Sequence, residues 1–134
     1  MILFLDDSLD RISIFKQHFP STVVATTAKD CIERLKDPIE WSVVLLDHDL
    51  NDEIFVDSDR KDCGMEVVRW ICKEKPILGK IIIHTHNYIA SLLMFNTLSK
   101  ASYDVQMIPF DQLLEKINKY KERENDEDTS FGWT

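Results

Sequence analysis

Short apolar runs alternate with helix-period segments along almost the whole chain, and this alternation constrains the fold more than any other feature. Five runs are continuous and rich in Ile, Val and Leu: Ile2–Leu5, Thr22–Ala25, Trp41–Leu46, Lys80–Ile83 and Val105–Ile108. Such runs are typical of parallel strands that are buried on both faces. The pattern therefore predicts five parallel strands.

The segments between these runs have the periodicity and the boundaries of helices. Ser8 and Thr27 are suitable N-caps, and Pro20 and Pro38 end the first two helices. Further helices are expected at about 64–74, at about 87–99 and from about 111 onwards. Strict alternation predicts an α/β fold, a doubly wound five-stranded parallel sheet.

The length and charge of the chain limit what it can bind. A chain of 134 residues has room for a single domain. Its 24 acidic and 16 basic side chains give a formal net charge of −8. This excess of acid argues against long nucleic acid and anionic membrane surfaces, since both attract surplus Lys and Arg. A small phosphate-bearing ligand, handled through a metal ion, remains compatible with it.

Cysteine usage and the N-terminus indicate a cellular compartment. The three cysteines, at positions 31, 63 and 72, lack C-x-x-C or metal-finger spacing, so reduced thiols are expected. The apolar N-terminal run stops at Asp6, which is too early for a signal peptide or a membrane span. We therefore expect a cytoplasmic protein.

Polar residues that can do chemistry stand directly after three of the predicted strands. They are Asp6 and Asp7 after the first strand, Asp47, His48 and Asp49 after the third, and His84, Thr85, His86 and Asn87 after the fourth. Ligands of open parallel sheets bind outside the carboxyl ends of the strands, so these side chains are expected to converge on one cleft if the strand order is 2-1-3-4-5. Clustered carboxylates repel one another unless a cation neutralises them, which predicts Mg²⁺ or, with imidazole ligands, Mn²⁺ or Zn²⁺.

At these strand ends the sequence resembles a response-regulator receiver domain, over about residues 1–121. This resemblance implies a receiver/flavodoxin-like sheet with the strand order 2-1-3-4-5. Asp6 and Asp7 match the acidic pair that holds Mg²⁺ in that family, and Asp47 matches its phospho-accepting aspartate. Thr85 matches the Ser/Thr after the fourth strand, and Pro109 the proline after the fifth. One departure matters, because receivers place a phosphoryl-contacting lysine directly before that proline, at position 108, where this chain has isoleucine.

The strings Leu-Asp-His-Asp-Leu at 46–50 and Ile-His-Thr-His-Asn at 83–87 resemble a more particular group. Together with Arg11 and Gly64 they are similar to the receiver-like subfamily named for proposed cyclic-phosphate processing. Asn51 stands where a glycine is more usual. The resemblance implies a metal-dependent phosphoesterase, or a binder, for a cyclic phosphate of a nucleotide or an RNA end.

That implied activity assigns a role to each candidate residue. Asp6, Asp7 and Asp47 would hold the ion, while Asp47, His48 and His84 would form the catalytic set. Arg11, Thr85 and Asn87 would bind the phosphoryl oxygens. Asp49 would orient a histidine or support a metal ligand.

Two alternatives remain open on the sequence alone. The chain could be a stand-alone receiver-type signalling module that acts through a protein partner, with or without phosphorylation of Asp47. It could also sequester a cyclic nucleotide without cleaving it, since binding and turnover need the same hydrogen-bond donors.

Two segments depart from the regular pattern. Residues 51–63 are long for a strand-to-helix connection, so they are a candidate lid or binding loop, although the acids within them are expected to face solvent. Residues 122–134 are expected to form a solvated acidic C-terminal tail that follows the domain of residues 1–121.

Overall fold

Five parallel strands form one sheet in the order β2-β1-β3-β4-β5, which confirms the predicted topology. The computed structural model describes residues 1–51 and 53–123. The strands are β1 (Ile2–Leu5), β2 (Val23–Ala25), β3 (Val43–Leu46), β4 (Lys80–Ile83) and β5 (Val105–Met107). The helices are α1 (Leu9–His18), α2 (Ala28–Leu35), α3 (Gly64–Glu74), α4 (Tyr88–Lys100) and α5 (Phe110–Arg123).

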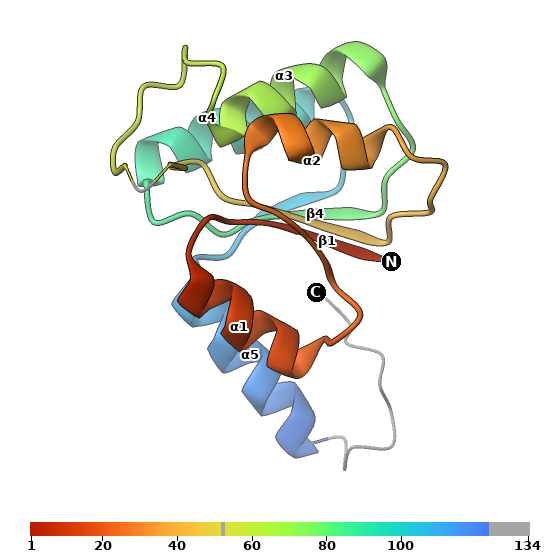
Figure 1. The fold of residues 1–134 in the computed structure, drawn as a ribbon, viewed down its shortest axis with the longest axis vertical. Coiled ribbons are helices and arrows are strands. Elements are labelled where there is room, and N and C mark those ends of the chain that lie inside the picture. The colour runs from red at the N-terminus through yellow and green to blue at the C-terminus, as the bar shows by residue number, and fades with distance from the viewer. Residues whose placement is uncertain (52, 124–134) are drawn as a thin grey trace.

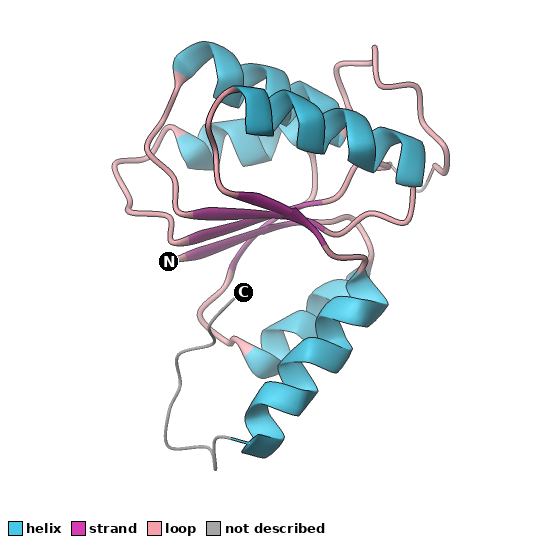
Figure 2. Cartoon of the chain, turned by 180° about the vertical axis from the view of Figure 1, so that it is seen from behind, coloured by secondary structure: helices cyan, strands magenta, loops and turns pink. Residues whose placement is uncertain are grey.

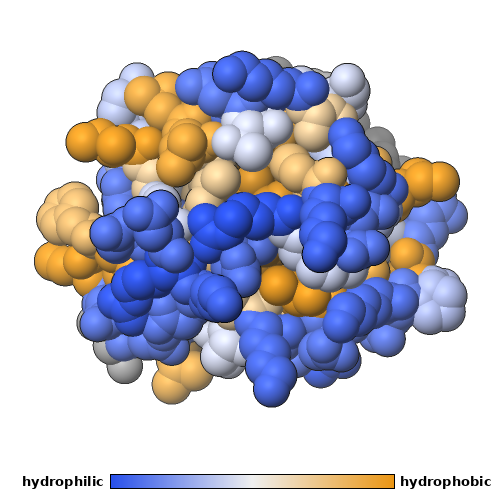
Figure 3. All heavy atoms as spheres, turned by 90° about the horizontal axis from the view of Figure 1, so that it is seen from above, coloured by the Kyte–Doolittle hydropathy of each residue, from blue (hydrophilic) through white to orange (hydrophobic). Residues whose placement is uncertain are grey.

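Helices cover both faces of the sheet, as Figures 1 and 2 show. One face lies against α2, α3 and α4, and the other lies against α1 and α5. Successive side chains of a strand point to opposite faces, so the two cores divide β1 between them. Leu3 and Leu5 join the larger apolar cluster, and Phe4 joins the smaller one with Phe15 and Phe110. The outer surface of the α2, α3 and α4 layer is mostly hydrophilic (Figure 3).

Side-chain caps set where three of the helices begin. The hydroxyl of Ser8 accepts a hydrogen bond from Arg11 N at 3.3 Å, and that of Thr27 accepts from Asp30 N at 3.0 Å. The amide oxygen of Asn87 accepts from Ala90 N at 3.2 Å at the start of α4. Because α1 and α4 begin just after β1 and β4, these caps place two helix N-termini at the carboxyl edge of the sheet.

The structure differs from the predicted element bounds mainly at the ends. Three strands are shorter than the apolar runs that predict them. Thr22 lies outside β2, Trp41 lies outside β3, and Ile108 lies outside β5. Helix α5 continues to Arg123, two residues into the predicted tail, and residues 124–134 of that tail lie outside the described residues. Within the described ranges, every helix is too short or too polar to cross a membrane.

Candidate active site

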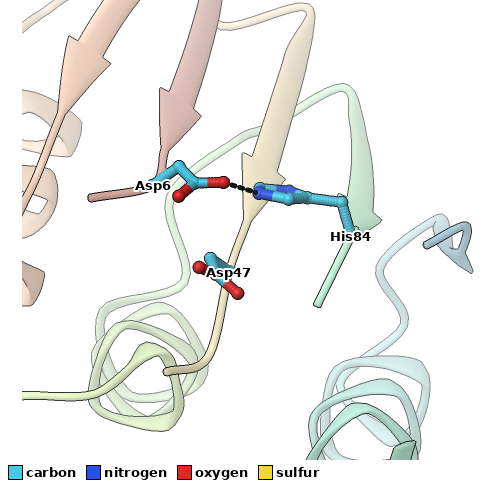
Figure 4. A group of neighbouring side chains, drawn as sticks. All are labelled: Asp6, Asp47 and His84. Atoms are coloured by element: carbon cyan, nitrogen blue, oxygen red, sulfur yellow. Dashed lines mark hydrogen bonds and ion pairs between the residues drawn. The ribbon is translucent and has the colours of Figure 1, made fainter. Parts of the chain in front are cut away.

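The polar residues at the ends of β1, β3 and β4 meet in one buried cluster, as their positions in the sequence predict. Carboxylate oxygens of Asp6 and Asp47 and one imidazole nitrogen of His84 all lie within 4.8 Å of one another. Figure 4 shows the three side chains pointing toward one another from neighbouring strands. All three are buried, with at most 5 % of each residue exposed. Three adjacent strands thus build the centre of the site.

Asp6 is the most heavily hydrogen-bonded member of this cluster. Arg11 donates two hydrogen bonds to it, from Nε to Oδ2 at 2.7 Å and from Nη2 to Oδ1 at 2.9 Å. Ser8 N donates to Oδ1 at 2.9 Å, and His84 Nε2 lies 3.0 Å from Oδ2. Burial acts to raise the pKa of Asp6, but the hydrogen bonds from His84 and Arg11 outweigh it and hold that pKa well below its usual range.

Asp47 is held more loosely and has the opposite electrostatic character. Its Oδ1 accepts a hydrogen bond from His48 N at 2.8 Å, and Arg11 Nη2 lies 3.6 Å from its Oδ2. Burial and the neighbouring charge of Asp6 raise the pKa of Asp47 to about 6, although His84 and Arg11 oppose the rise. The site therefore contains one ionised carboxylate and one that exchanges a proton near neutral pH.

The ring of His84 is fixed by aromatic neighbours. It stacks on Phe4 with a centroid distance of 4.8 Å and meets Phe110 edge-on at 6.1 Å. Because a carboxylate only accepts hydrogen bonds, the contact with Asp6 places a proton on Nε2. The Nδ1 atom is buried and has no hydrogen-bond partner among the described residues. The imidazole edge that faces the two carboxylates is thus the edge that holds the proton.

His48 lies behind the site rather than in it, which differs from the catalytic role that the sequence predicts. The ring is buried, its Nδ1 lies 2.7 Å from Asp49 Oδ1, and its Nε2 lies 3.0 Å from Ser58 Oγ. Both nitrogens are therefore engaged within the protein, and the residue does not line the pocket. His48 therefore stabilises the loop after β3 through its contacts with Asp49 and Ser58.

Asp49 joins that loop to the rest of the site. Its carboxylate contacts His48, as the sequence predicts, and accepts hydrogen bonds from Phe55 N at 2.8 Å and Val56 N at 3.1 Å. Asn87 Nδ2 donates to the same carboxylate at 3.1 Å. Several of these donors lower the pKa of Asp49 despite its partial burial. One ionised side chain therefore ties the loop to the beginning of α4.

The cluster opens into a pocket of about 680 Å³, within the usual range for small-ligand sites. The residues that line it include the predicted phosphate-binding set, Arg11, Thr85 and Asn87. Thr85 Oγ1 accepts a hydrogen bond from Asn87 N at 3.1 Å. The Asn87 side chain is engaged at both ends, by its cap on α4 and by Asp49, so Arg11 and Thr85 are better placed to meet a ligand.

The side chains of the cluster are of the chemical types that bind divalent cations. Two carboxylates and one imidazole are ligands that Mn²⁺ accepts, and the carboxylates alone suit Mg²⁺. Asp7, the third predicted metal ligand, lines the pocket but is not part of the close group of Asp6, Asp47 and His84. Both oxygens of Asp6 already accept two hydrogen bonds each, so an ion at Asp6 must compete with the Arg11 guanidinium.

Sequence reasoning missed several residues of this region. Ser58 gives no motif signal, because its contact with His48 depends on how the loop folds back. Glu53 lines the pocket, in contrast to the expectation that the acids of this loop face solvent, and so do the neighbouring Ile54 and Phe55. Their apolar character within a charged loop is a signal that could have revealed them. His86, ambiguous on the sequence, also lines the pocket.

Comparison with solved structures supports the fold. The chain is 16 % identical to a protein whose structure is titled an adenylate cyclase from Rhodopirellula baltica, with a TM-score of 0.58 over 94 % of this chain and 93 % of that one. A fusion that carries the yeast Spc42 trimeric coiled coil is also 16 % identical, with a TM-score of 0.56 over 91 % of this chain and 78 % of that one. Identities this low show a shared fold alone. A comparison with curated proteins finds no match.

Comparison with protein families is more specific. The model of the cyclic-phosphate processing receiver domain matches residues 1–100, which include β1, β3 and β4 and the polar residues that follow them. This match covers well over half of the chain and confirms the resemblance seen at the strand ends. The chain therefore belongs to the cyclic-phosphate processing receiver domain family.

Proposed function

We propose that this protein binds the phosphoryl group of a cyclic phosphate ester and hydrolyses it. The observation that carries the proposal is the position of Arg11, whose guanidinium spans Asp6 and Asp47 at the wall of the pocket. Arg11 supplies the planar, permanently charged fork that suits phosphoryl oxygens. The N-termini of α1 and α4 at the same edge add further attraction for an anion.

Hydrolysis of a cyclic phosphodiester adds one water across one P–O bond. The water oxygen bonds to phosphorus, the ring oxygen leaves, and a proton passes from the water to the departing oxygen. Asp47 is the proposed base, because a pKa of about 6 lets it accept a proton near neutral pH and release it afterwards. His84 is the proposed donor to the leaving oxygen, from the protonated edge that faces both carboxylates.

Arg11 and Thr85 are proposed to hold the phosphoryl oxygens, while Asp6 and Asn87 keep the donors in place. Mg²⁺ or Mn²⁺, if bound by Asp6 and Asp47 with Asp7, would polarise a phosphoryl oxygen. Such an ion would compete with Arg11 for the Asp6 oxygens.

Phosphorylation-dependent signalling, the other function considered, is less well supported. Receivers contact the phosphoryl group with a lysine at the position that Ile108 occupies here. Ile108 packs against the apolar cluster of Phe4, Phe15 and Phe110 and offers no charge to the site. A partner-binding role that does not use Asp47 chemistry is an independent proposal, and no contact among the described residues favours it.

The test is turnover of 2′,3′-cyclic and 3′,5′-cyclic nucleotides by the purified full chain, with EDTA, Mg²⁺ or Mn²⁺ present. We expect linear phosphomonoester product, followed by chromatography, and loss of that product in Asp47→Asn and His84→Gln. Asp37→Asn is the matched control, because Asp37 is an exposed acid outside the pocket. Tight binding without turnover would favour sequestration, and full activity in both site variants would refute the assigned residues.

A further inference from the structure

The rim of the pocket is apolar, although its floor is charged. Leu9, Ile54 and Phe55 line the pocket, and each is more than three-quarters exposed. We call these three residues the apolar rim. Large side chains exposed beside a polar cavity are typical of a surface that a ligand covers. In these positions the three side chains add little buried apolar surface to the core, so we expect a ligand to cover them.

The structure holds one member of this rim, Phe55, in place. Phe55 has a φ of 52°, a left-handed conformation that is unfavourable for a residue with a bulky side chain. The hydrogen bond from its backbone N–H to Asp49 stabilises this conformation, and the next residue, Val56, is buried and anchors the loop. Asp49 also accepts from Asn87, so the rim is tied directly to the phosphate-binding floor.

The charge of the pocket limits how many phosphates a ligand can bring. Among the residues that the structure describes, five carboxylates line it against one guanidinium, that of Arg11; the acids are Asp7, Asp10, Asp47, Asp49 and Glu53. Arg60 pairs with Glu53 at 2.7 Å, which offsets one of them. A polyphosphate or an RNA strand would still meet net repulsion, whereas a ligand with a single negative charge needs only Arg11 and the helix N-termini.

The size of the pocket completes the description of the ligand. A volume of about 680 Å³ is far more than a cyclic phosphate and its ester ring would fill, and the remaining space borders the apolar rim. A flat, uncharged group attached to the phosphate would cover that rim. Nucleobases have this form, and their π-faces stack on aromatic side chains.

We propose that the ligand is a mononucleoside cyclic phosphate, whose phosphate lies at Arg11 and Thr85 and whose base stacks on Phe55 within the apolar rim. This inference rests on the proposed function, since it takes the phosphate position from it. It goes further in assigning a base-binding residue and in excluding RNA ends, which the sequence leaves open as a ligand class.

The test compares ligands with and without a base. Calorimetry measures the binding of adenosine 2′,3′-cyclic and 3′,5′-cyclic phosphate. The same measurement is made with the corresponding methyl riboside cyclic phosphates, in which a methoxy group replaces the base. All proteins carry Asp47→Asn, so that hydrolysis does not consume the ligand. We expect Phe55→Ala to weaken nucleotide binding about tenfold and to leave riboside binding unchanged, because loss of stacking affects the base alone. Phe55→Tyr should keep nucleotide binding.

Ile77→Ala is the matched control, since Ile77 is 97 % exposed and lies outside the pocket. Equal losses for nucleotide and riboside in Phe55→Ala would show a merely structural role and overturn the inference. Tighter binding of an oligoribonucleotide that ends in a 2′,3′-cyclic phosphate would overturn the restriction to mononucleotides. Base-dependent binding without turnover by the wild type would support the inference and refute the proposed hydrolysis. Failure to bind any of these ligands would refute both the inference and the proposed function.

Discussion

Replacement of Asp47 by Asn should stabilise the protein at neutral pH while it removes the proposed base. The pKa of Asp47 is raised from 3.8 to about 6, chiefly by burial. Each pKa unit corresponds to about 1.4 kcal/mol, so keeping this carboxylate ionised in the fold costs about 3 kcal/mol above pH 7. Asn keeps the acceptor for His48 N, and the raised pKa already includes the weak attraction of Arg11, so we expect a gain of about 3 kcal/mol.

The sign of the pH dependence follows from which state holds the proton. Between about pH 4 and 6 the folded protein keeps a proton on Asp47 that the unfolded chain has released, so the wild type loses stability as pH rises through that window. Asn has no proton to lose. The variant and the wild type should therefore differ fully above about pH 7 and hardly at all at about pH 4.

Urea unfolding at several pH values measures this difference directly. In thermal unfolding at about pH 7.5, the same gain should raise the melting temperature by about 10 °C. Asp37→Asn serves as the control, since it removes one negative charge from an exposed position. Two results would contradict this reasoning: an Asp47→Asn variant no more stable than the wild type at about pH 7.5, or one equally stabilised at about pH 4. Either would show that ionised Asp47 does not lower the free energy of unfolding.

Three further predictions address the neighbours of this residue. Arg11→Met should remove ligand binding and cost about 2 kcal/mol in urea unfolding, because buried Asp6 loses two charged hydrogen bonds; Mn²⁺ affinity, measured by calorimetry, should rise as the competing cation is removed. Gly64→Ala should cost about 3 kcal/mol or more, since its Cβ would lie 1.9 Å from the Asp47 carbonyl oxygen. Calorimetry with a cyclic nucleotide phosphorothioate that resists hydrolysis should show affinity falling as pH rises through about 6 in the wild type, because Asp47 ionises, and staying flat in Asp47→Asn.

Much of the fold can be predicted because its signals are local. Apolar runs mark β1, β3 and β4, and capping residues such as Ser8 and Thr27 mark where helices begin. The strand order is the one that the receiver resemblance implies, and right-handed connections then place helices on both faces of the sheet. The convergence of Asp6, Asp47 and His84 then follows from the strand order alone.

The rest of the site depends on directions that sequence position does not reveal. Successive side chains leave a strand in opposite directions, and this alternation separates His48, which turns into the interior, from Asp47, which faces the pocket. The loop of residues 51–63 has no periodicity, and its course depends on hydrogen bonds from Phe55 and Val56 to Asp49. Such contacts between a loop and a distant side chain cannot be inferred from spacing.

The two partners of Asp6 lie at very different distances along the chain, and this affects how the site forms as the protein folds. Arg11 is five residues away, so that ion pair can form as soon as β1 and α1 exist. His84 is 78 residues away and reaches Asp6 after β4 has joined the sheet. A chain still leaving the ribosome would thus hold the cation and the carboxylate before it holds the proton donor. Under the proposed function, the site therefore becomes complete late, when β4 joins the sheet.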